Sequence, residues 1–490
     1  MTADVAIIKT DVFHYPDNIT FRPDKKYPEY MFGDDLSDHN HVYEMVREGF
    51  YKLGLDAENY GSEQWNPLKN IVKPGDVVLI KPNMVMDKNA GGFGTECLYT
   101  HPSVVAPIID YVLKALAGTG EIIVGDAPVQ SCNFDSLIKE SHYNDLIEYY
   151  QSKTNIKIYL KDFRDVKSIR QKNGLSYSTQ AETSSGKVID LGKESAFSDK
   201  SEAYFDKLRI TNYDPNILKL HHDKEKHEYC INEDVLRADV IINVPKPKTH
   251  RKAGVTIALK NMVGISARKE YLPHHANGSK EEGGDEFLHS SKLKNLKDDL
   301  LDKRNYYMQT EKNYVKAGFF QNSLRILNQI IKRTQKDSYS EGSWYGNDTI
   351  CRTIIDLNKI IFYADKNGHM CDKMQRKYFI VADMIISGEK EGPLLPSPKD
   401  VGIIAMGENP VCFDDIVATI MGAMVEHIPT LVHAKNNKSK YTFLPAKEAN
   451  IVSNDERWNN KTIKDMNKDS ILFFKPSDGW REVFVNKCEE

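Results

Sequence analysis

Basic and imidazole side chains cluster directly after an apolar segment near the middle of the sequence. Residues 238–244 (Ala-Asp-Val-Ile-Ile-Asn-Val) are β-branched and almost wholly apolar, which predicts a central strand of a parallel sheet. The prolines that follow prevent both a sheet ladder and a helix, so Lys246, Lys248 and His250 are expected on an extended loop. Ligands of open α/β sheets bind beyond the carboxyl ends of the strands. A cationic loop at this place therefore predicts an anionic ligand.

A second lysine motif follows shortly after this loop. Leu259-Lys260-Asn261 lies between two apolar stretches. The Lys260 amine is expected to neutralise a phosphate or carboxylate, or to act as a base if burial lowers its pKa. The alternative is structural: the aliphatic part of Lys260 lies along an apolar surface and Asn261 stabilises a turn.

Polar residues that follow other predicted strands extend this candidate site. Lys81 and Asn83 come after one apolar segment, Asp126 after the next, and Asp383 after a later one. In a parallel sheet these side chains converge with the cationic loop at one edge, where they are expected to form one pocket. Taken alone, each is equally well explained as a helix cap or a solvated loop residue.

The sequence predicts a role for each of these groups. His250, Lys260 and Asp126 are expected to be catalytic, with His250 as the acid or base and Asp126 orienting its neighbours. The remaining cationic, hydroxyl and amide side chains are expected to bind the substrate: Lys81, Asn83, Lys246, Lys248, Thr249, Asn261 and Arg352.

A histidine pair on a glycine-rich segment predicts a divalent-cation site. His274 and His275 precede a Gly-Gly-Asp-Glu segment at 283–286, and nitrogen and oxygen ligands of this kind bind divalent metals. Asp383 and Asp414 are expected to add carboxylate ligands, so that the cation assists chemistry on the bound anion. Adjacent histidines point in different directions, however. The alternative is a polar flap that closes over the pocket.

Composition narrows the class of protein. The chain has 490 residues and a formal net charge of −4, which argues against a dedicated nucleic-acid binder. Its seven cysteines include no C-x-x-C pair, so no iron–sulfur cluster or zinc ribbon is expected. No apolar run approaches the ~20 residues of a membrane helix, and the first residues resemble a strand rather than a signal peptide. A cytoplasmic protein is expected, and its oligomeric state is left open.

Alternating strand and helix patterns predict an α/β fold: a mostly parallel sheet with helices on both faces and two polar or helical insertions. Residues 1–265 and 341–425 are expected to form the α/β core. Within it, residues 165–232 are polar and irregular, which predicts an excursion with little core of its own. Residues 266–340 are expected to form an insertion with a lid loop and helices, and residues 426–490 a C-terminal extension.

The predicted helix at 313–334 of this insertion carries an apolar stripe. We expect the stripe to pack against the rest of the molecule rather than to form a binding groove. Its members are Phe319, Leu324, Leu327, Ile330 and Ile331.

Several of these segments together resemble a known family. The sequence is similar to the DUF362 family, a domain of unknown function, in motifs that occur in order between about residues 76 and 425. The most specific are Lys-x-Lys-Thr-His at 246–250 and Leu-Lys-Asn at 259–261. The His-His and Trp-Tyr-Gly-Asn-Asp-Thr segments resemble a longer subgroup. Some relatives carry an appended ferredoxin module, which this sequence lacks. The resemblance implies a common pocket and no particular reaction.

Two hypotheses of function follow. In the first, the protein is an enzyme that acts, with help from a divalent cation, on an anionic small molecule such as a phosphorylated or carboxylated metabolite or a glycan precursor. In the second, it is a non-catalytic protein that carries a ligand or metal for a partner enzyme. An enzyme is expected to hold His250 near a carboxylate or the substrate in a closed pocket, whereas a carrier leaves the basic loop open and flat.

Overall fold

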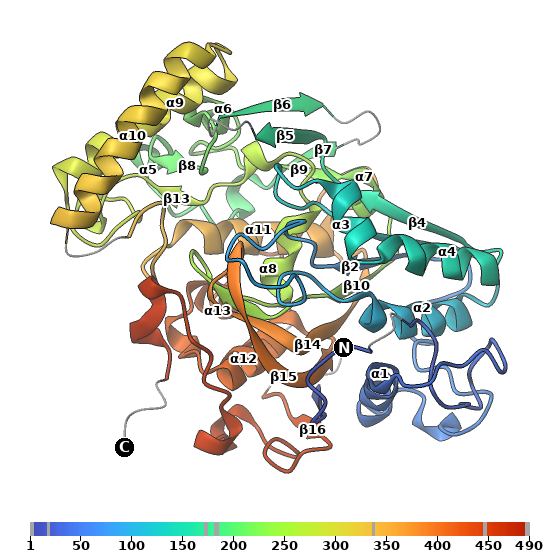
Figure 1. The fold of residues 1–490 in the computed structure, drawn as a ribbon. Helices are drawn as coiled ribbons and strands as arrows, with labels where there is room; N and C mark the ends of the chain where they lie inside the picture. Colours follow the sequence, from blue (N-terminus) through green and yellow to red (C-terminus); the bar gives the residue numbers. More distant parts are fainter. Residues whose placement is uncertain are drawn as a thin grey trace.

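A large mixed sheet forms the centre of the molecule in the computed structural model, which describes residues 4–16, 20–170, 175–180, 186–335, 339–443 and 448–485. Its strands are β1 (Val5–Lys9), β2 (Val77–Pro82), β3 (Glu121–Asp126), β4 (Lys157–Asp162), β10 (Val240–Val244), β11 (Lys248–His250), β12 (Gly254–Thr256), β14 (Lys377–Glu391), β15 (Leu395–Gly407) and β16 (Ile451–Ser453). Among the described residues the order is β16-β1-β15-β14-β10-β2-β3-β4, with β11 paired to β14 and to β12 (Figure 1). Strands β14, β10, β2, β3 and β4 run parallel to one another, whereas β15 is antiparallel to both β14 and β1. The predicted α/β class with a mostly parallel sheet is confirmed.

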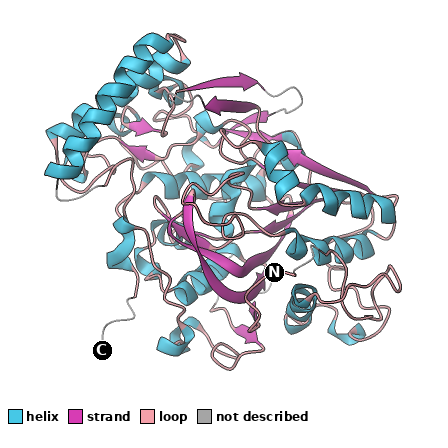
Figure 2. Ribbon diagram, in the orientation of Figure 1, coloured by secondary structure: helices cyan, strands magenta, loops and turns pink. Residues whose placement is uncertain are grey.

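Helices cover both faces of this sheet (Figure 2), so its central strands are apolar on both sides. Alternate residues of a strand point to opposite faces. Ile80 and Ile242 belong to the core of one face, which we call the α2 face, and Leu79 and Ile241 to the core of the other, the α11 face. The α2 face is covered by α1 (His41–Lys52), α2 (Pro102–Leu116), α3 (Phe134–Glu140) and α4 (Tyr143–Lys153). The α11 face is covered by α8 (Ala258–Asn261), α11 (Thr349–Tyr363), α12 (Pro410–Met421) and α13 (Pro429–Lys435).

Two of these helices begin as their sequence indicates. At α12 the side chain of Asn409 accepts hydrogen bonds from the N–H groups of Val411 (3.0 Å) and Cys412 (3.3 Å), and Pro410 occupies the first turn. At α2 the cap is His101, again followed by proline. Asparagine caps and first-turn prolines are favourable because the first N–H groups of a helix lack intrahelical acceptors.

The β14–β15 hairpin is longer than its sequence indicates. The glycines, prolines and acidic residues of 388–398 predict a loop, yet β14 continues to Glu391 and β15 begins at Leu395. Cross-strand pairs such as Gly388 with Pro398 extend the ladder beyond the sheet. Glycine and proline within the segment suggest a loop. The hairpin tolerates Pro396 and Pro398 because they lie on β15, which pairs with β1 only from Ile403 onward, so that this part of β15 is an edge among the described residues.

The first excursion contains a small core, contrary to the expectation that it has little. It comprises β5 (Val166–Arg170), β6 (Ser176–Gln180), β7 (Gly186–Asp190), α5 (Glu202–Phe205), β8 (Leu208–Arg209), α6 (Pro215–Lys219), β9 (Glu228–Asn232) and α7 (Glu233–Leu236). Phe197, Phe205, Leu208 and Leu218 are buried together with Ala276 of the second insertion. These widely spaced apolar residues show no period, so the sequence pattern did not reveal that they meet.

The second insertion contains β13 (His275–Ala276), α9 (Lys292–Gln309) and α10 (Tyr314–Thr334). Strand β13 pairs with β8 of the first excursion, which joins the two insertions. Helices α9 and α10 pack against each other as a hairpin at the periphery of the molecule (Figure 1). No helix among the described residues is both long and apolar enough to cross a membrane.

The C-terminal segment is integral to the sheet and its core. Strand β16 pairs with β1, and Trp458 and Trp480 are fully buried in the core of the α11 face. The Trp480 ring lies so close to Gly254 that a Cβ there would be 2.6 Å from the indole. Residues 426–443 and 448–485 thus complete the α/β core rather than extend it.

Candidate active site

A cavity of about 490 Å³ lies at the carboxyl ends of β2 and β3. Its wall is built from the loops after these two strands, the β11–β12 turn, α8, the segment 269–274 and the tip of the β14–β15 hairpin. We call it the basic cavity because Lys252, Lys260 and Lys269 line it. Of the site residues predicted from the sequence, the wall contains Asn83, Asp126, His250, Lys260, Asn261 and His274.

A buried ion pair lies beneath the cavity. Lys81 Nζ donates to Asp126 Oδ1 at 2.7 Å, and Asp126 also accepts from the N–H groups of Met84 (2.6 Å) and Ala127 (2.9 Å). Burial lowers the pKa of Lys81, although the carboxylate of Asp126 opposes this shift. With three donors, Asp126 is held in one orientation and fixes the loops after β2 and β3 to each other.

Amide side chains connect this region to the cationic loop. Asn261 donates to Asn243 Oδ1 at 2.7 Å and accepts from Asn83 at 2.9 Å. Asn83 Oδ1 accepts from Lys248 Nζ at 2.8 Å, and the same amine donates to a backbone carbonyl. Burial, with Lys246 nearby, lowers the pKa of Lys248 to about 7. Lys248 was expected to contact the ligand, but its amine serves this internal network and does not line the cavity.

Two lysines in the cavity wall have no carboxylate partner among the described residues. Within the described part of the chain, Lys260 Nζ has neither a hydrogen-bond nor an ion-pair partner. Burial, followed by the charge of Lys81, lowers the pKa of Lys260 to about 8. Lys269 donates to the carbonyl oxygens of Ala127 (2.9 Å) and Val263 (3.3 Å), and burial lowers its pKa to about 7. These amines give the cavity positive charge that no bonded acid cancels, together with bases that titrate near neutral pH.

The charge of the third lysine of the wall, Lys252, is balanced by Glu341, an acid that sequence reasoning missed. Arg251 donates to Glu341 Oε2 at 2.7 Å, and Lys252 donates to Thr211 Oγ1 at 2.7 Å. Burial alone would raise the pKa of Glu341, but the charges of Lys252 and Arg251 lower it to about 2. Burial lowers the pKa of Lys252 to about 8. Glu341 follows an insertion and lies in a polar loop, so nothing in its local sequence indicated a place in the cavity wall.

The two histidines of the wall are neutral and differ in the ring nitrogen they leave available. Nδ1 of His250 accepts from the N–H groups of Lys252 (3.0 Å) and Ala253 (3.1 Å). Burial and the charge of Lys260 hold its pKa well below the ordinary range, so the ring carries its proton on Nε2. Nδ1 of His274 donates to Leu272 O at 2.6 Å, and burial lowers its pKa to about 3. His250 therefore offers the cavity a donor and His274 an acceptor.

A second buried ion pair, between two residues of the predicted site, lies on the other face of the sheet. Lys246 Nζ donates to Asp383 Oδ2 at 3.0 Å. Along β14 Asp383 alternates with residues that point to the α11 face, and so shares the α2 face with Val381 and Ile385. Lys81, two residues after Leu79, points to the α11 face. The expected single pocket is thus corrected: the predicted residues meet at one edge of the sheet but form two clusters on opposite faces.

The Lys246–Asp383 cluster is closed by the N-terminal segment. Tyr15 OH donates to Asp383 Oδ1 at 2.7 Å, and the N–H of His101 donates to Oδ2 at 2.9 Å. The Tyr15 ring stacks on His101 at a centroid distance of 3.9 Å, and Lys246 also bonds the tyrosine hydroxyl. Every polar side chain here is buried, so Lys246 anchors the strand end and does not line the basic cavity.

Three other predicted residues also lie away from the cavity. Asp414 accepts from the first N–H groups of α8 at 2.8 and 2.9 Å, and burial raises its pKa to about 8. Thr249 lies in β11, a strand where the sequence predicted a loop, and donates to a carbonyl of β14 at 2.8 Å, which ties β11 to the hairpin. Arg352 forms ion pairs with Asp348 (2.9 Å) and Asp199 (2.6 Å). Each holds elements together around the site, although Arg352 was expected to bind substrate and Asp414 a metal.

The segment expected to form a lid directs its carboxylates away from the cavity. Asp285 accepts from the N–H of Ala276 (2.6 Å) and from Thr349 Oγ1 (2.5 Å), and burial raises its pKa to about 6. Glu286 accepts from the N–H of Glu341 at 2.9 Å. The ring of His275, in β13, is buried outside the cavity wall. These contacts fasten the segment to α11, and its movement stays a prediction.

The residues expected to bind a metal lie in separate surroundings. Within the described residues, Asp348, Cys351 and His433 form the one group of three whose potential ligand atoms lie within 4.8 Å of one another. Asp348 already pairs with Lys200 (2.6 Å), Arg352 (2.9 Å) and His433 (2.6 Å). Two permanent cations at this carboxylate oppose a metal ion, so ion pairing explains the group.

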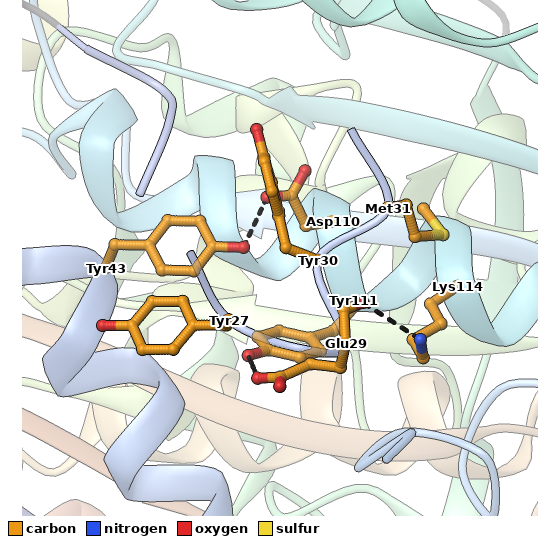
Figure 3. Close-up of a pocket in the computed structure, with 8 residues that line it drawn as sticks. All are labelled: Tyr27, Glu29, Tyr30, Met31, Tyr43, Asp110, Tyr111 and Lys114. Atoms are coloured by element: carbon orange, nitrogen blue, oxygen red, sulfur yellow. Dashed lines mark hydrogen bonds between the residues drawn. The ribbon is translucent and has the colours of Figure 1, made fainter. Parts of the chain in front are cut away.

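A much smaller cavity lies between the N-terminal segment and α2 (Figure 3). Its volume is about 10 Å³, which accommodates about one water molecule. Tyr43 OH donates to Asp110 Oδ2 at 2.7 Å, and Tyr111 OH donates to Glu29 Oε1 at 3.1 Å. The first bond joins α1 to α2 and the second holds the N-terminal segment on α2, and the cavity has no room for a substrate.

A third cavity adjoins the basic cavity. It measures about 520 Å³ and shares Gln130 and Tyr213 with the basic cavity wall. Apolar, serine, glutamine and tyrosine side chains contribute to its lining, and Glu270 and Lys312 are the charged residues among those described there. We call it the side cavity. It lies beside the lysine-lined wall of the basic cavity.

This fold and cavity define an α/β protein whose binding site lies beyond the carboxyl ends of its parallel strands. The chain belongs to the family described as "Domain of unknown function (DUF362)", which matches residues 78–419 and so includes every residue that lines the basic cavity. A thylakoid-associated protein of Synechocystis sp. is 26% identical over 212 residues. The similar region covers 43% of this chain and 46% of that protein, so the chain spans less than half of this curated relative.

Proposed function

We propose that the protein is a cytoplasmic enzyme that acts on an anionic small molecule bound in the basic cavity. The observation that carries the proposal is Lys260: its amine lines the cavity, bonds no acid among the described residues, and has a pKa lowered to about 8. A cavity that keeps an unneutralised amine favours an anionic ligand. An amine that titrates near neutral pH is also suited to proton transfer, which a site for binding alone does not need.

Each residue of the wall has a role in this proposal. Lys269 and the protonated fraction of Lys260 bind the anionic group, and the neutral fraction of Lys260 accepts a proton from the substrate. His250 donates a hydrogen bond from Nε2, and Asp126 is positioned by Lys81 to orient the ligand. The sequence suggested His250 as the acid or base; in this proposal it is a hydrogen-bond donor and not the base, because backbone donors occupy its other nitrogen.

The size of the site bears on the substrate class. The basic cavity exceeds the volume that a single phosphate or carboxylate needs, and the side cavity adds a lining of mixed apolar and polar side chains in which Glu270 and Lys312 are the charged residues. An elongated molecule with one anionic end, such as a phosphorylated metabolite or a glycan precursor, would place that end in the basic cavity and the rest in the side cavity. The lysines supply the charge that neutralises its anionic end.

The test compares binding with turnover. The purified protein is incubated with an anionic metabolite extract, and mass spectrometry records which compounds bind and which are consumed. We expect a compound whose consumption is lost in Lys260→Met and retained in Lys26→Met, a matched change at an exposed lysine in the N-terminal segment. Binding without consumption would identify a carrier, and equal activity of the two variants would remove Lys260 from the mechanism.

A further inference from the structure

Helix α10 has two apolar faces, of which only one is covered. Leu324, Leu327 and Ile331 are buried. Phe319 and Ile330, expected to pack with them, are instead exposed. The exposed face consists of Val315 (86% exposed), Phe319 (68%), Ile326 (64%) and Ile330 (42%). The sequence pattern joined both faces into one stripe because residues of the two faces alternate along the chain.

The exposed apolar residues form a straight stripe. At about 100° per residue, positions 315, 319, 326 and 330 fall within about 60° of one another around the helix axis, and they span about 22 Å along it. The α9–α10 hairpin lies at the edge of the molecule (Figure 1), so a flat surface can reach the stripe. A stripe of four large apolar side chains on such a projection is more than the isolated exposed residues that are normal on protein surfaces.

The charge of α10 differs from that of the whole chain. The protein carries a formal net charge of −4, but residues 314–334 contain no acidic residue. Their four cationic side chains, all exposed, are Lys316, Arg325, Lys332 and Arg333. Within α10 the apolar stripe is therefore accompanied by positive charge alone.

We propose that α10 docks the protein on the surface of a membrane that contains anionic lipids. The helix would lie in the plane of the interface, with the stripe among the acyl chains and the cationic side chains at the lipid phosphates. Charge complementarity selects this partner over a second copy of the chain. Two α10 helices packed stripe to stripe would bring four positive charges of each copy together without an acid on either helix. This proposal is independent of the chemistry in the basic cavity.

Vesicle co-sedimentation of the full-length protein tests the proposal. The probes are vesicles of phosphatidylcholine alone and of phosphatidylcholine mixed with phosphatidylglycerol. We expect co-sedimentation with the mixed vesicles only, and we expect it to weaken as salt is raised. Phe319→Ser combined with Ile326→Ser should lower vesicle affinity by about tenfold or more, because two apolar side chains no longer insert. Lys332→Gln combined with Arg333→Gln should also weaken it.

The control is Leu220→Ser, which removes an apolar side chain of similar exposure (64%) on another part of the surface and should leave vesicle binding unchanged. Circular dichroism and thermal unfolding check that each variant is folded, which is expected because the substituted side chains are exposed. Three results would overturn the proposal: no binding to mixed vesicles, equal binding to both vesicle types, or a dimer in light scattering that the Phe319→Ser and Ile326→Ser changes dissociate. The last result would assign the stripe to a second copy of the chain.

Discussion

Gly264 lies against Asp126 so closely that a Cβ at this position would come within 1.8 Å of Asp126 Oδ1 and 2.7 Å of Lys81 Nζ. The carbonyl of Gly264 also accepts from the N–H of Ala127 at 2.8 Å. The segment after α8 can therefore approach the ion pair only because residue 264 has no side chain. This contact joins the Leu-Lys-Asn motif to the ends of β2 and β3.

Gly264→Ala should destabilise the protein by about 1–3 kcal/mol, because the added methyl group must displace the ion pair or the segment that carries Lys260. Chemical denaturation provides the measurement. Gly318→Ala is the matched control: it lies within α10, where an added Cβ meets no atom within 4 Å, and should be neutral or slightly stabilising. Equal effects of the two changes would show that the close approach is relaxed in solution.

Anion affinity should fall as pH rises through about 8, because Lys260 and Lys269 lose their protons at and below this value. Sulfate is a suitable probe, since its charge is constant over this range, and calorimetry gives its affinity. Lys260→Met should reduce the affinity at neutral pH by roughly tenfold, the loss of one charge-assisted hydrogen bond. In the Lys260→Met variant, the sulfate affinity should also change less with pH above neutral pH than it does in the wild type. A sulfate affinity independent of both pH and this substitution would place the anion elsewhere.

Lys246→Met should destabilise the fold by about 3–5 kcal/mol, because it leaves the Asp383 carboxylate buried without its cation. Adding Asp383→Leu should restore much of the stability, since both charges are then absent. Anion binding in the basic cavity should survive in the double variant. If Lys246→Met instead abolished sulfate binding and left unfolding unchanged, the original assignment of this lysine to the ligand would be right.

Asp414 should make stability fall as pH rises. Burial raises its folded-state pKa to about 8, whereas the unfolded carboxyl titrates near about 3.9. Between these values the folded protein binds the proton and the unfolded chain releases it, so the contribution of this group is complete below about pH 4 and declines up to about pH 8. Denaturation of wild type and Asp414→Asn across this window gives the difference in stability. As pH rises, the free energy of unfolding of wild type should fall relative to that of Asp414→Asn. A difference that does not change with pH would contradict the raised pKa.

Local sequence patterns were sufficient for three adjacent parallel strands, β10, β2 and β3. The runs at 77–82, 121–126 and 240–244 are short, apolar and followed by polar or proline residues, and each is a strand of the structure. Asn409-Pro410 likewise marked the start of α12. These features depend on a few neighbouring residues, which is why periodicity and capping rules detect them.

The face on which a side chain lies was harder to predict. Lys81 and Asp383 both follow buried strand residues. Because alternate residues of a strand point to opposite faces, Lys81 shares the α11 face with Leu79, and Asp383 shares the α2 face with Val381. To decide whether the two side chains share one pocket, one must know which face of the sheet each residue occupies. That depends on the register between strands far apart in the sequence, which no local pattern provides. Lys260 and His250 were found because their motifs lie beside the strand end. Glu341 and Tyr15 were missed because each reaches its partners from a polar segment far away in the sequence.

The position of β1 affects how the chain folds during synthesis. Its two neighbours in the sheet are β15 and β16, both formed from residues near the far end of the sequence. The apolar Val5–Lys9 segment therefore leaves the ribosome several hundred residues before its hydrogen-bonding partners, which must be made before it can pair. An unpaired apolar strand is a site for association with other chains, so chaperone protection of the nascent protein is expected to determine the yield of folded molecules.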